Sequence, residues 1–486
     1  MTTYEAGDIT LQKVRKYVWE IPQEDEMNVP ARVLASEALL EEISDDKTLE
    51  QLRNTTHLPG IRKYAICMPD GHQGYGFPVG GVAGIDAENG CISPGAVGYD
   101  INCGVRMLKT NLAYDDVSGR EEELVTALFD AIPSGLGGGG IFEGTIDDVE
   151  EILADGMEWA LRNDYAVPAD LEHCEDEGYR PDADPSAVSQ KAKDRGKVQV
   201  GSLGSGNHFL EVQRVTDVFR EDVATEFGLQ EDQIVVLIHC GSRGLGHQVC
   251  TDYLREIEKT HKDLLEQLPD RELAAAPAGS RLAEEYYGAM CAAINFAWVN
   301  RQLIMHRTRY VFEEVFDREW ETMEMDLLYD VAHNIAKKEV HDVDGTETEL
   351  YVHRKGATRA FPAGRPELPP AYSEVGQPII IPGSMGAGSY VLRGGEHSLE
   401  ETFGSTAHGA GRLMSRTQAK QTYWGEDVRD DLREQQQIYV KARSGATVAE
   451  EAPGVYKDVD EVVRISDALG IGDKVARTFP VCNIKG

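Results

Sequence analysis

Residues 97–110, VGYDINCGVRMLKT, join a turn rich in Gly and Asn to a segment with β propensity. Two similar apolar runs precede it, YAICM at 64–68 and VGGVAGI at 79–85, and turns containing Gly or Pro separate the three. Helical patterns and a second strand-rich region follow, at 118–196, 248–340 and 350–395. The chain shows no repeat of fixed period and no flexible linker. This order of segments predicts an α+β fold, built either as one large domain or as two tightly merged ones.

The first 60 residues are polar, with helical periodicity at 31–53, and are predicted to form a peripheral N-terminal segment. The acidic stretch 171–186 is predicted to be a surface loop. The longest apolar runs, IVVLI at 234–238 and PIIIP at 378–382, have the length of strands and not of membrane spans. Because the N-terminus also lacks the basic-then-apolar pattern of a signal peptide, we expect a cytoplasmic protein without membrane contact.

The chain of 486 residues is strongly acidic: 84 Asp and Glu against 48 Lys and Arg give a formal net charge of −36. This excess is larger than solubility requires and is spread along the chain, which is typical of halophilic proteins that work in molar salt. Counterion release weakens at molar salt, so a few local cations can still bind nucleic acid. The eight cysteines include no C-x-x-C pair, so neither a zinc ribbon nor a disulfide framework is predicted.

Three histidines stand at positions that expose a side chain to a site. His208 lies in GSGNHFLE, His239 follows IVVLI, and His408 lies in STAHGAGR. Each fits a structural role as well as a functional one. His333, in MDLLYDVAHNIAKK, lies beside an apolar stripe with helical spacing, and the residues alone predict a structural histidine on a helix.

Asp100 and Cys103 stand three positions apart in the turn quoted above. Separately they fit a turn aspartate and a buried cysteine, which are common structural features. Together with several imidazoles they make a mixed-ligand site for a transition metal. A thiolate can also bridge two ions, which two-metal phosphoryl chemistry places about 3.5–4 Å apart.

Small residues and cations form candidate phosphate sites. The turn PGSMGAGS (382–389) can present backbone N–H groups and the hydroxyls of Ser384 and Ser389 to an anion, although it is not a Walker A loop. It fits a tight double turn equally well. Four basic side chains are further candidates, with solvated surface positions as the alternative: Arg243, Lys355, Arg412 and Arg416.

Together these motifs resemble the RtcB-type RNA-splicing ligases, also called tRNA-splicing ligases. The resemblance rests on motifs in family order: MPDGHQGYGFPVGGV (68–82), VGYDINCGVR (97–106), GSLGSGNHFLE (201–211), HCGSRGLG (239–246), AHN (332–334), HRKGATRA (353–360), IPGSMGAGSY (381–390), STAHGAGR (405–412) and PVCNIKG (480–486). It implies a single large mixed α+β domain with a central β-rich core surrounded by helices. The catalytic domain would span 61–486, behind the peripheral segment 1–60. Combined with the acidic composition, the resemblance suggests a protein from a haloarchaeon.

The resemblance also implies roles for individual residues. Cys103 would bridge two Mn(II) ions, with Asp100 and His208 on one side and His239 and His333 on the other. His408 would be the nucleophile that takes GMP from GTP. The positions implied to hold the guanylate are Asn207, Glu211, Asn334, Ser384, Ser389, Gly409, Ala410, Gly411, Tyr456 and Lys485. Those implied to bind RNA phosphate are Arg243, Arg412, Arg416 and Lys355.

The implied activity is GTP- and Mn(II)-dependent ligation of RNA in tRNA splicing and RNA repair. A 2′,3′-cyclic phosphate end is opened to a 3′-phosphate, activated with GMP as an RNA 3′-pp-guanosine, and joined to a 5′-hydroxyl end. The substrates would be tRNA halves, and the family implies an archease-type activator. Two alternatives need fewer residues: a two-metal phosphoesterase without a covalent step, and an RNA-binding protein that holds metal without catalysis. Cys240, where we expect a small residue, and the acidic surface depart from the family pattern.

Overall fold

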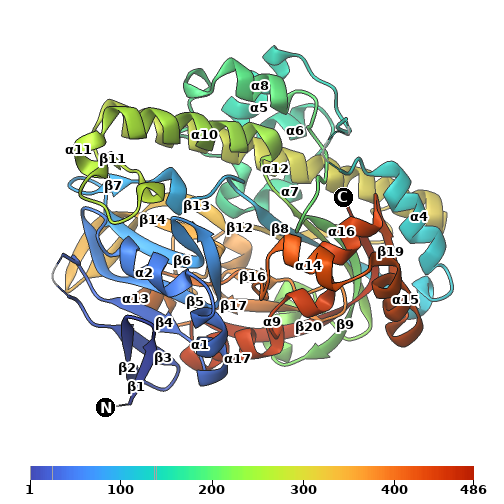
Figure 1. The fold of residues 1–486 in the computed structure, drawn as a ribbon. Coiled ribbons are helices and arrows are strands. Elements are labelled where there is room, and N and C mark those ends of the chain that lie inside the picture. The colour runs from blue at the N-terminus through green and yellow to red at the C-terminus, as the bar shows by residue number, and fades with distance from the viewer. Residues whose placement is uncertain (1, 25, 136, 138) are drawn as a thin grey trace.

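Two eight-stranded sheets form the centre of the computed structural model, which describes residues 2–24, 26–135, 137 and 139–486 (Figure 1). In the first sheet only β4 and β5 pair in parallel. Its strands, in spatial order, are β1 (Thr3–Ala6), β2 (Ile9–Arg15), β3 (Val18–Ile21), β4 (Ala31–Leu34), β5 (Ile61–Tyr75), β6 (Phe77–Asp86), β14 (Thr346–Lys355) and β13 (Asn334–Val343).

The second sheet carries the apolar run at 234–238 in its middle, on β10. Every residue of this strand is buried, as expected for a strand covered on both faces. In spatial order the strands are β12 (Asp326–Ala332), β8 (Gly104–Ala113), β10 (Gln233–Cys240), β9 (Phe209–Val218), β20 (Gly472–Lys485), β17 (Ser389–Gly394) and β16 (Pro378–Ile381), with β19 (Tyr439–Ala442) paired in parallel to β20. Two small sheets pair β7 (Cys91–Ile92) with β11 (Ala276–Pro277) and β15 (Ala357–Arg359) with β18 (Ser405–Ala407).

Helices surround these sheets, and the long α10 and α12 pack against each other across one side of the molecule (Figure 1). The longer helices are α4 (Glu121–Ala131), α5 (Ile146–Asp155), α10 (Arg243–Thr260), α12 (Arg281–Phe316), α15 (Gly425–Gln436) and α17 (Val459–Leu469). The shorter ones are α1 (Glu37–Ser44), α2 (Thr48–Thr55), α3 (Tyr114–Val117), α6 (Met157–Arg162), α7 (Pro168–Glu172), α8 (Gln190–Gly196), α9 (Glu221–Phe227), α11 (Lys262–Leu265), α13 (Ser398–Thr402), α14 (Arg416–Thr422) and α16 (Gly445–Glu450). The prediction of a single mixed α+β domain with a β-rich core is confirmed.

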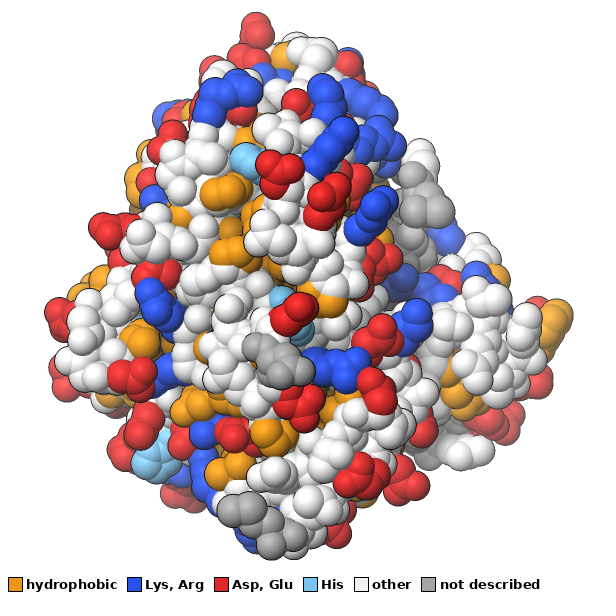
Figure 2. Space-filling view, turned by 60° about the vertical axis from the view of Figure 1, so that its left-hand side comes forward, with side chains coloured by type: hydrophobic (Ala, Val, Ile, Leu, Met, Phe, Trp, Pro, Cys, Tyr) orange, Lys and Arg blue, Asp and Glu red, His pale blue; other side chains and the backbone are white. Residues whose placement is uncertain are grey.

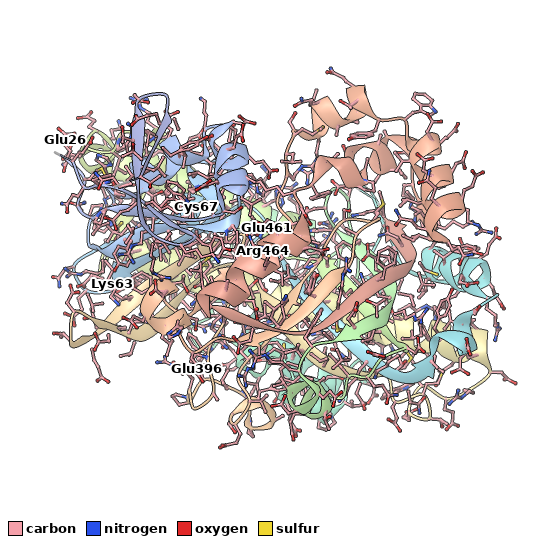
Figure 3. The ribbon with its side chains drawn as sticks, turned by 90° about the horizontal axis from the view of Figure 1, so that it is seen from below. Glu26, Lys63, Cys67, Glu396, Glu461 and Arg464 are labelled. Atoms are coloured by element: carbon pink, nitrogen blue, oxygen red, sulfur yellow. The ribbon has the colours of Figure 1, made fainter. Side chains whose placement is uncertain are left out.

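The C-terminal helix α17 shows how one amphipathic helix closes the core. Val462, Val463 and Ile465 are buried. Seen from below in Figure 3, Glu461 and Arg464 lie on the same helix, and their side chains form an ion pair with an Nε–Oε2 distance of 2.7 Å. Apolar burial on one face and a short ion pair outside it are the features expected of a helix that covers a sheet.

Two local predictions are wrong. The segment 31–53 begins with strand β4 and only then forms α1 and α2. The segment 326–340, predicted to be helical, forms strands β12 and β13. Its apolar residues match helical spacing because β12 is buried on both faces and so carries a nearly continuous apolar run.

The N-terminal segment supplies four strands at the edge of the first sheet. Because β4 pairs with β5, one sheet continues across the predicted boundary at residue 60, which stays a prediction. On the face shown in Figure 2, acidic side chains are spread among the basic ones and do not gather in one patch. In the described part of the chain, no helix is long and apolar enough to cross a membrane.

Candidate active site

The candidate site lies where neighbouring strands of the second sheet end together. Cys103 stands one residue before β8, and His208 stands one residue before β9. His239 lies near the end of β10, where the antiparallel register places it opposite Phe209. His333 directly follows β12 and precedes β13, so it marks the passage between the two sheets. Strand register alone therefore brings together residues that are far apart in the sequence.

The turn before β8 is fixed by backbone hydrogen bonds. The Cys103 N–H donates to the Asp100 carbonyl (2.9 Å), and the Cys103 carbonyl accepts from the His333 N–H (2.8 Å). Asn102 adopts a left-handed conformation with φ of 52°, which Asn tolerates better than most residues. The Asn334 side chain donates to the Asp100 carbonyl (3.1 Å) and accepts from the Gly356 N–H (2.9 Å). Asn334 thus supports the turn with the same amide that was predicted to contact guanylate.

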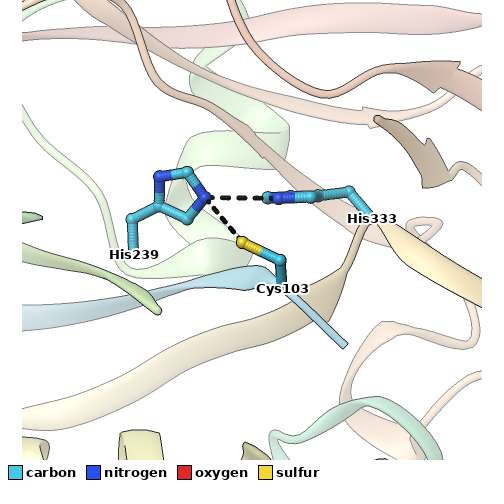
Figure 4. Close-up of side chains that lie close together, drawn as sticks. All are labelled: Cys103, His239 and His333. Atoms are coloured by element: carbon cyan, nitrogen blue, oxygen red, sulfur yellow. Dashed lines mark hydrogen bonds between the residues drawn. The ribbon is translucent and has the colours of Figure 1, made fainter. Parts of the chain in front are cut away.

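The side chains predicted to bind metal form two overlapping groups, and Cys103 belongs to both. One group is Cys103, His239 and His333, and the other is Asp100, Cys103 and His208; the candidate ligand atoms within each lie within 4.8 Å of one another. The Cys103 Sγ lies 3.3 Å from the His239 Nε2, which in turn lies 3.2 Å from the His333 Nε2 (Figure 4). On the other side, the Cys103 Sγ lies 3.5 Å from the His208 Nε2, and that nitrogen lies 2.8 Å from the Asp100 Oδ2.

The three imidazoles have different electrostatic surroundings. Burial lowers the pKa of His239 and of His333 well below the usual value, and neighbouring imidazoles lower it further. Burial also opposes the charge on His208, but the neighbouring thiols and Asp100 raise its pKa well above the usual value. Burial raises the pKa of the Cys103 thiol to about 11, with Asp100 adding to the rise. The lowered pKa values favour the neutral form of His239 and His333, which is the form in which histidine binds metal.

This donor set fits a transition-metal site. Thiolate, imidazole and carboxylate ligands meet in a buried site, and the Asp100 Oδ1 is buried without a hydrogen-bond partner among the described residues. The facing Nε2 atoms of His239 and His333 both offer lone pairs, which a cation bound between them would satisfy. Cys103 is the one side chain shared by the two groups, as a bridging ligand would be.

His408 lies beside the metal-ligand cluster and is oriented by a buried acid. Its ring centroid lies 4.8 Å from that of His333. The Asp70 Oδ2 accepts hydrogen bonds from the His408 Nδ1 (2.6 Å), the His408 N–H (3.0 Å) and the Gly409 N–H (3.2 Å). When Nδ1 donates to Asp70, the lone pair of a neutral imidazole lies on Nε2, which is the arrangement that a nucleophilic histidine would need.

A cavity of about 740 Å³ opens beside this cluster. The predicted residues that line it are Cys103, Asn207, His239, His333, Asn334, Lys355, Ser384, His408, Gly409, Ala410, Gly411, Arg412, Arg416, Tyr456 and Lys485. In the described part of the chain, the remaining predicted residues do not line it: Asp100, His208, Glu211, Arg243 and Ser389. The volume suits a nucleotide-sized ligand.

Glu211 and Ser389 are joined through Gln213. The Gln213 amide donates to the Ser389 hydroxyl (3.1 Å) and also to the Glu211 carboxylate. Asn483 donates to the other oxygen of Glu211. Burial raises the pKa of the Glu211 carboxyl to about 7, although Lys485 opposes the rise. Glu211 can therefore change its charge near neutral pH.

The four predicted phosphate ligands differ in their surroundings. Arg416 is half exposed and lines the cavity, and its Nη2 donates to the Asn207 Oδ1 (3.3 Å). The Arg243 guanidinium is buried and lies 3.3 Å from the His208 Nδ1. The Lys355 ammonium donates to three backbone carbonyls, those of Tyr75, Phe77 and Gly95, at 2.7–3.0 Å. Its donors are thus all engaged, which leaves none for an RNA phosphate in this arrangement.

Two residues of the site were missed by sequence reasoning. Asp70 lies inside the motif MPDGHQGYGFPVGGV, two residues after the strand-like run YAICM (64–68), so a signal for it was present. Glu451 is fully buried and accepts a hydrogen bond from the Tyr456 hydroxyl, and it forms an ion pair with Arg412 at 3.0 Å. Nothing in the sequence distinguishes Glu451 from its neighbours, because it is one acid in an acid-rich chain.

Comparison with known proteins points to one family. A family model described as "tRNA-splicing ligase RtcB" matches residues 51–486. The chain is 56% identical over 479 residues to the tRNA-splicing ligase RtcB of Thermococcus kodakarensis, with 98% of this chain and 99% of the relative covered. Relatives of the same description from Aeropyrum pernix (98% and 99% covered) and Nanoarchaeum equitans (99% and 100% covered) are 51% and 50% identical.

Proposed function

The chain belongs to the RtcB family of tRNA-splicing ligases and is an RNA ligase, and we propose that it joins RNA through a covalent histidine–GMP intermediate. The observation that carries the proposal is the pairing of His408 with Asp70 at 2.6 Å, next to the metal-ligand cluster and on the wall of a nucleotide-sized cavity. The substrates would be an RNA with a 2′,3′-cyclic phosphate or 3′-phosphate and an RNA with a 5′-hydroxyl. GTP would be the co-substrate.

Asp100, Cys103, His208, His239 and His333 would hold two Mn(II) ions, with Cys103 shared between them. When bound, such ions neutralise phosphate charge and support the departure of pyrophosphate. The ligand set does not by itself select Mn(II), because the same donors bind Zn(II) or Cu(II) more tightly. We therefore expect zinc to inhibit ligation, which a metal titration of the joining reaction measures.

In the first step, the His408 Nε2 attacks the α-phosphorus of GTP. A P–N bond forms, the bond from the α-phosphorus to the bridging oxygen breaks, and pyrophosphate leaves. Positive charge develops on the imidazole during the attack, and the Asp70 carboxylate, held on the Nδ1 side, is placed to stabilise it. The backbone of Gly409, Ala410 and Gly411 would lie close to the phosphate, and the remaining lining residues would hold the nucleoside.

The later steps transfer the guanylate to RNA. Water opens the cyclic phosphate, the resulting 3′-phosphate attacks the His408-bound phosphorus, and the P–N bond breaks to give an RNA 3′-pp-guanosine. The 5′-hydroxyl of the second strand then attacks the 3′-phosphate, and GMP leaves. Arg412 and Arg416 line the cavity and would bind the phosphates of the RNA ends.

The experiment that tests the proposal uses GTP labelled at the α-phosphate, with Mn(II) and with either the native protein or His408→Ala. We expect a labelled adduct that acid cleaves and alkali does not, and no adduct from the variant. A protein that hydrolyses the cyclic phosphate without forming an adduct would be the phosphoesterase alternative. A His408→Ala variant that still joins the two RNAs would overturn the nucleophile assignment.

Further properties follow as proposals from the family and the composition. We propose tRNA halves as substrates, with RNA repair as a second role, an archease-type activator as partner, and a cytoplasmic location. The charge of −36 suggests a haloarchaeal protein that needs high salt to fold. Its free energy of unfolding should rise with KCl concentration, and unfolding that is insensitive to salt would contradict this proposal.

A further inference from the structure

A single buried carboxylate, that of Glu451, connects several predicted ligand-binding side chains. Its Oε1 lies 3.0 Å from the Arg412 Nη1 and 3.6 Å from the Arg416 Nε. Its Oε2 lies 3.7 Å from the Lys485 Nζ and accepts a hydrogen bond from the Tyr456 hydroxyl. The Glu451 side chain has no solvent exposure and does not line the cavity. It therefore stands behind the lining residues.

The partners of Glu451 come from three separate segments of the chain. Arg412 and Arg416 follow β18, Tyr456 follows the turn after α16, and Lys485 ends β20. Two of these residues are proposed to hold guanylate and two to bind RNA phosphate. These contacts with four positions that the resemblance assigned to ligand binding indicate that Glu451 organises the site as a whole.

The carboxylate is needed because its partners repel one another. Arg412 and Lys485 are cations on the wall of one cavity, and Lys485 is buried, so their charges are poorly screened. Burial alone would raise the pKa of the Glu451 carboxyl, but Lys485 and Arg412 hold it below the usual value. Glu451 is thus ionised and compensates the cations. It also restricts long side chains that would otherwise adopt many conformations.

We propose that Glu451 is a positioning residue that fixes the Lys485 ammonium and the Tyr456 hydroxyl for recognition of a guanine nucleotide, and so sets the preference for GTP over ATP. The inference rests on the proposed GTP-dependent function. A fixed ammonium donates only, so it favours a base edge that presents a carbonyl acceptor, as guanine does, over one that presents an amino donor, as adenine does. A mobile or displaced ammonium loses this discrimination.

The test compares Glu451→Gln with Glu450→Gln in the full chain. The first variant keeps the shape and removes the buried charge. The second removes a charge from the adjacent side chain, which pairs with Lys420 at 3.1 Å. Formation of the labelled adduct is measured at a series of GTP and ATP concentrations, together with the melting temperature and the bound metal of each variant.

We expect Glu451→Gln to raise the KM for GTP by about 10- to 100-fold, the range that follows from losing a charged hydrogen bond. The rate at saturating GTP should change little, and the preference for GTP over ATP should fall. Glu450→Gln should behave as the native protein. A double-mutant cycle adds a second measure. Lys485→Met should raise the KM for GTP much less in the Glu451→Gln background than in the native protein.

The outcomes separate the inference from the function on which it rests. If Glu451→Gln has the KM for GTP and the preference for GTP over ATP of the native protein, the inference is overturned. The adduct formed by the native protein would still uphold the proposed function. A lower melting temperature with fewer active molecules and an unchanged KM would show a merely structural role. If the native protein forms no adduct, the proposed function fails. The inference is then tested by equilibrium binding of GTP to the native protein and to Glu451→Gln, and equal affinities overturn it.

Discussion

Asp70→Asn provides the sharpest test of how His408 is activated. The substitution keeps the shape of the side chain and removes its negative charge. The Asp70 Oδ2 accepts three hydrogen bonds, two of them from backbone N–H groups of His408 and Gly409. An asparagine must place its carbonyl oxygen there to satisfy the same donors. Its amide nitrogen then takes the position of the Oδ1, which is buried without a partner among the described residues.

The magnitude follows from this geometry. Hydrogen bonds to charged groups contribute about 1.5–3 kcal/mol, against about 0.5–1.5 kcal/mol for neutral ones. These ranges differ by about 1–1.5 kcal/mol, and the charge matters most when the imidazole becomes positive, so its loss should slow formation of the adduct by about 5- to 10-fold. The buried amide N–H groups left without partners should lower the free energy of unfolding by about 1–3 kcal/mol. Because Asp70 faces His408 and not the nucleoside, the KM for GTP should change little.

The assay is single-turnover labelling of the protein by α-phosphate-labelled GTP, at saturating GTP and metal. Asp46→Asn is the matched control, since the Asp46 carboxylate likewise accepts from backbone N–H groups, but from those of Thr48 and Gln73. We expect a native rate from the control. A folded Asp70→Asn variant that labels within about threefold of the native rate would refute the argument that the carboxylate activates His408.

Three further outcomes are expected. Cys103→Ala should abolish adduct formation and joining and lower the bound metal measured by mass spectrometry, whereas Cys291→Ala, in the buried face of α12, should keep both. Burial raises the pKa of Glu211 to about 7, so its carboxylate ionises only as the pH rises through that value. Because the family resemblance implies that this carboxylate holds guanylate, the affinity for GTP should increase between pH 6 and 8. Glu211→Gln should remove this pH dependence. Asp330→Asn should lower the free energy of unfolding in urea titrations by about 3–5 kcal/mol because it leaves two buried arginines uncompensated, while Asp326→Asn, exposed on the same strand, should cost under about 0.5 kcal/mol.

The sequence predicted the grouping of site residues better than the elements that carry them. Motif order indicated that Cys103, His208, His239 and His333 belong to one site, and the structure brings them together at adjacent strand ends. The element around His333 was predicted wrongly, since a strand buried on both faces lacks the alternation that would distinguish it from a helix. Spacing along the chain also could not show that the Lys355 ammonium turns toward backbone carbonyls.

Buried ion pairs escaped prediction for a different reason. The acidic stretch 171–186 was predicted to be a surface loop, yet Glu175 is fully buried and pairs with Lys337 (2.8 Å) and Arg359 (3.2 Å). Asp176 pairs with the same two cations at 2.7 and 3.1 Å. The composition of this stretch indicates a hydrophilic segment. Only folding brings the cations that compensate its buried carboxylates.

These buried pairs bear on how an acidic protein can act on RNA. Among the described buried residues, Lys and Arg outnumber Asp and Glu, although acids dominate the whole chain. The exposed surface is therefore even more acidic than the composition suggests, and it repels RNA over the Debye length, about 10 Å at 0.1 M salt and about 3 Å at 1 M. Cations at the cavity, such as Arg412 and Arg416, attract the phosphates at short range. High salt would shorten the range of this repulsion, whereas the contacts of Arg412, whose side chain is largely buried, are screened less. The acidic surface therefore opposes RNA binding mainly at low salt.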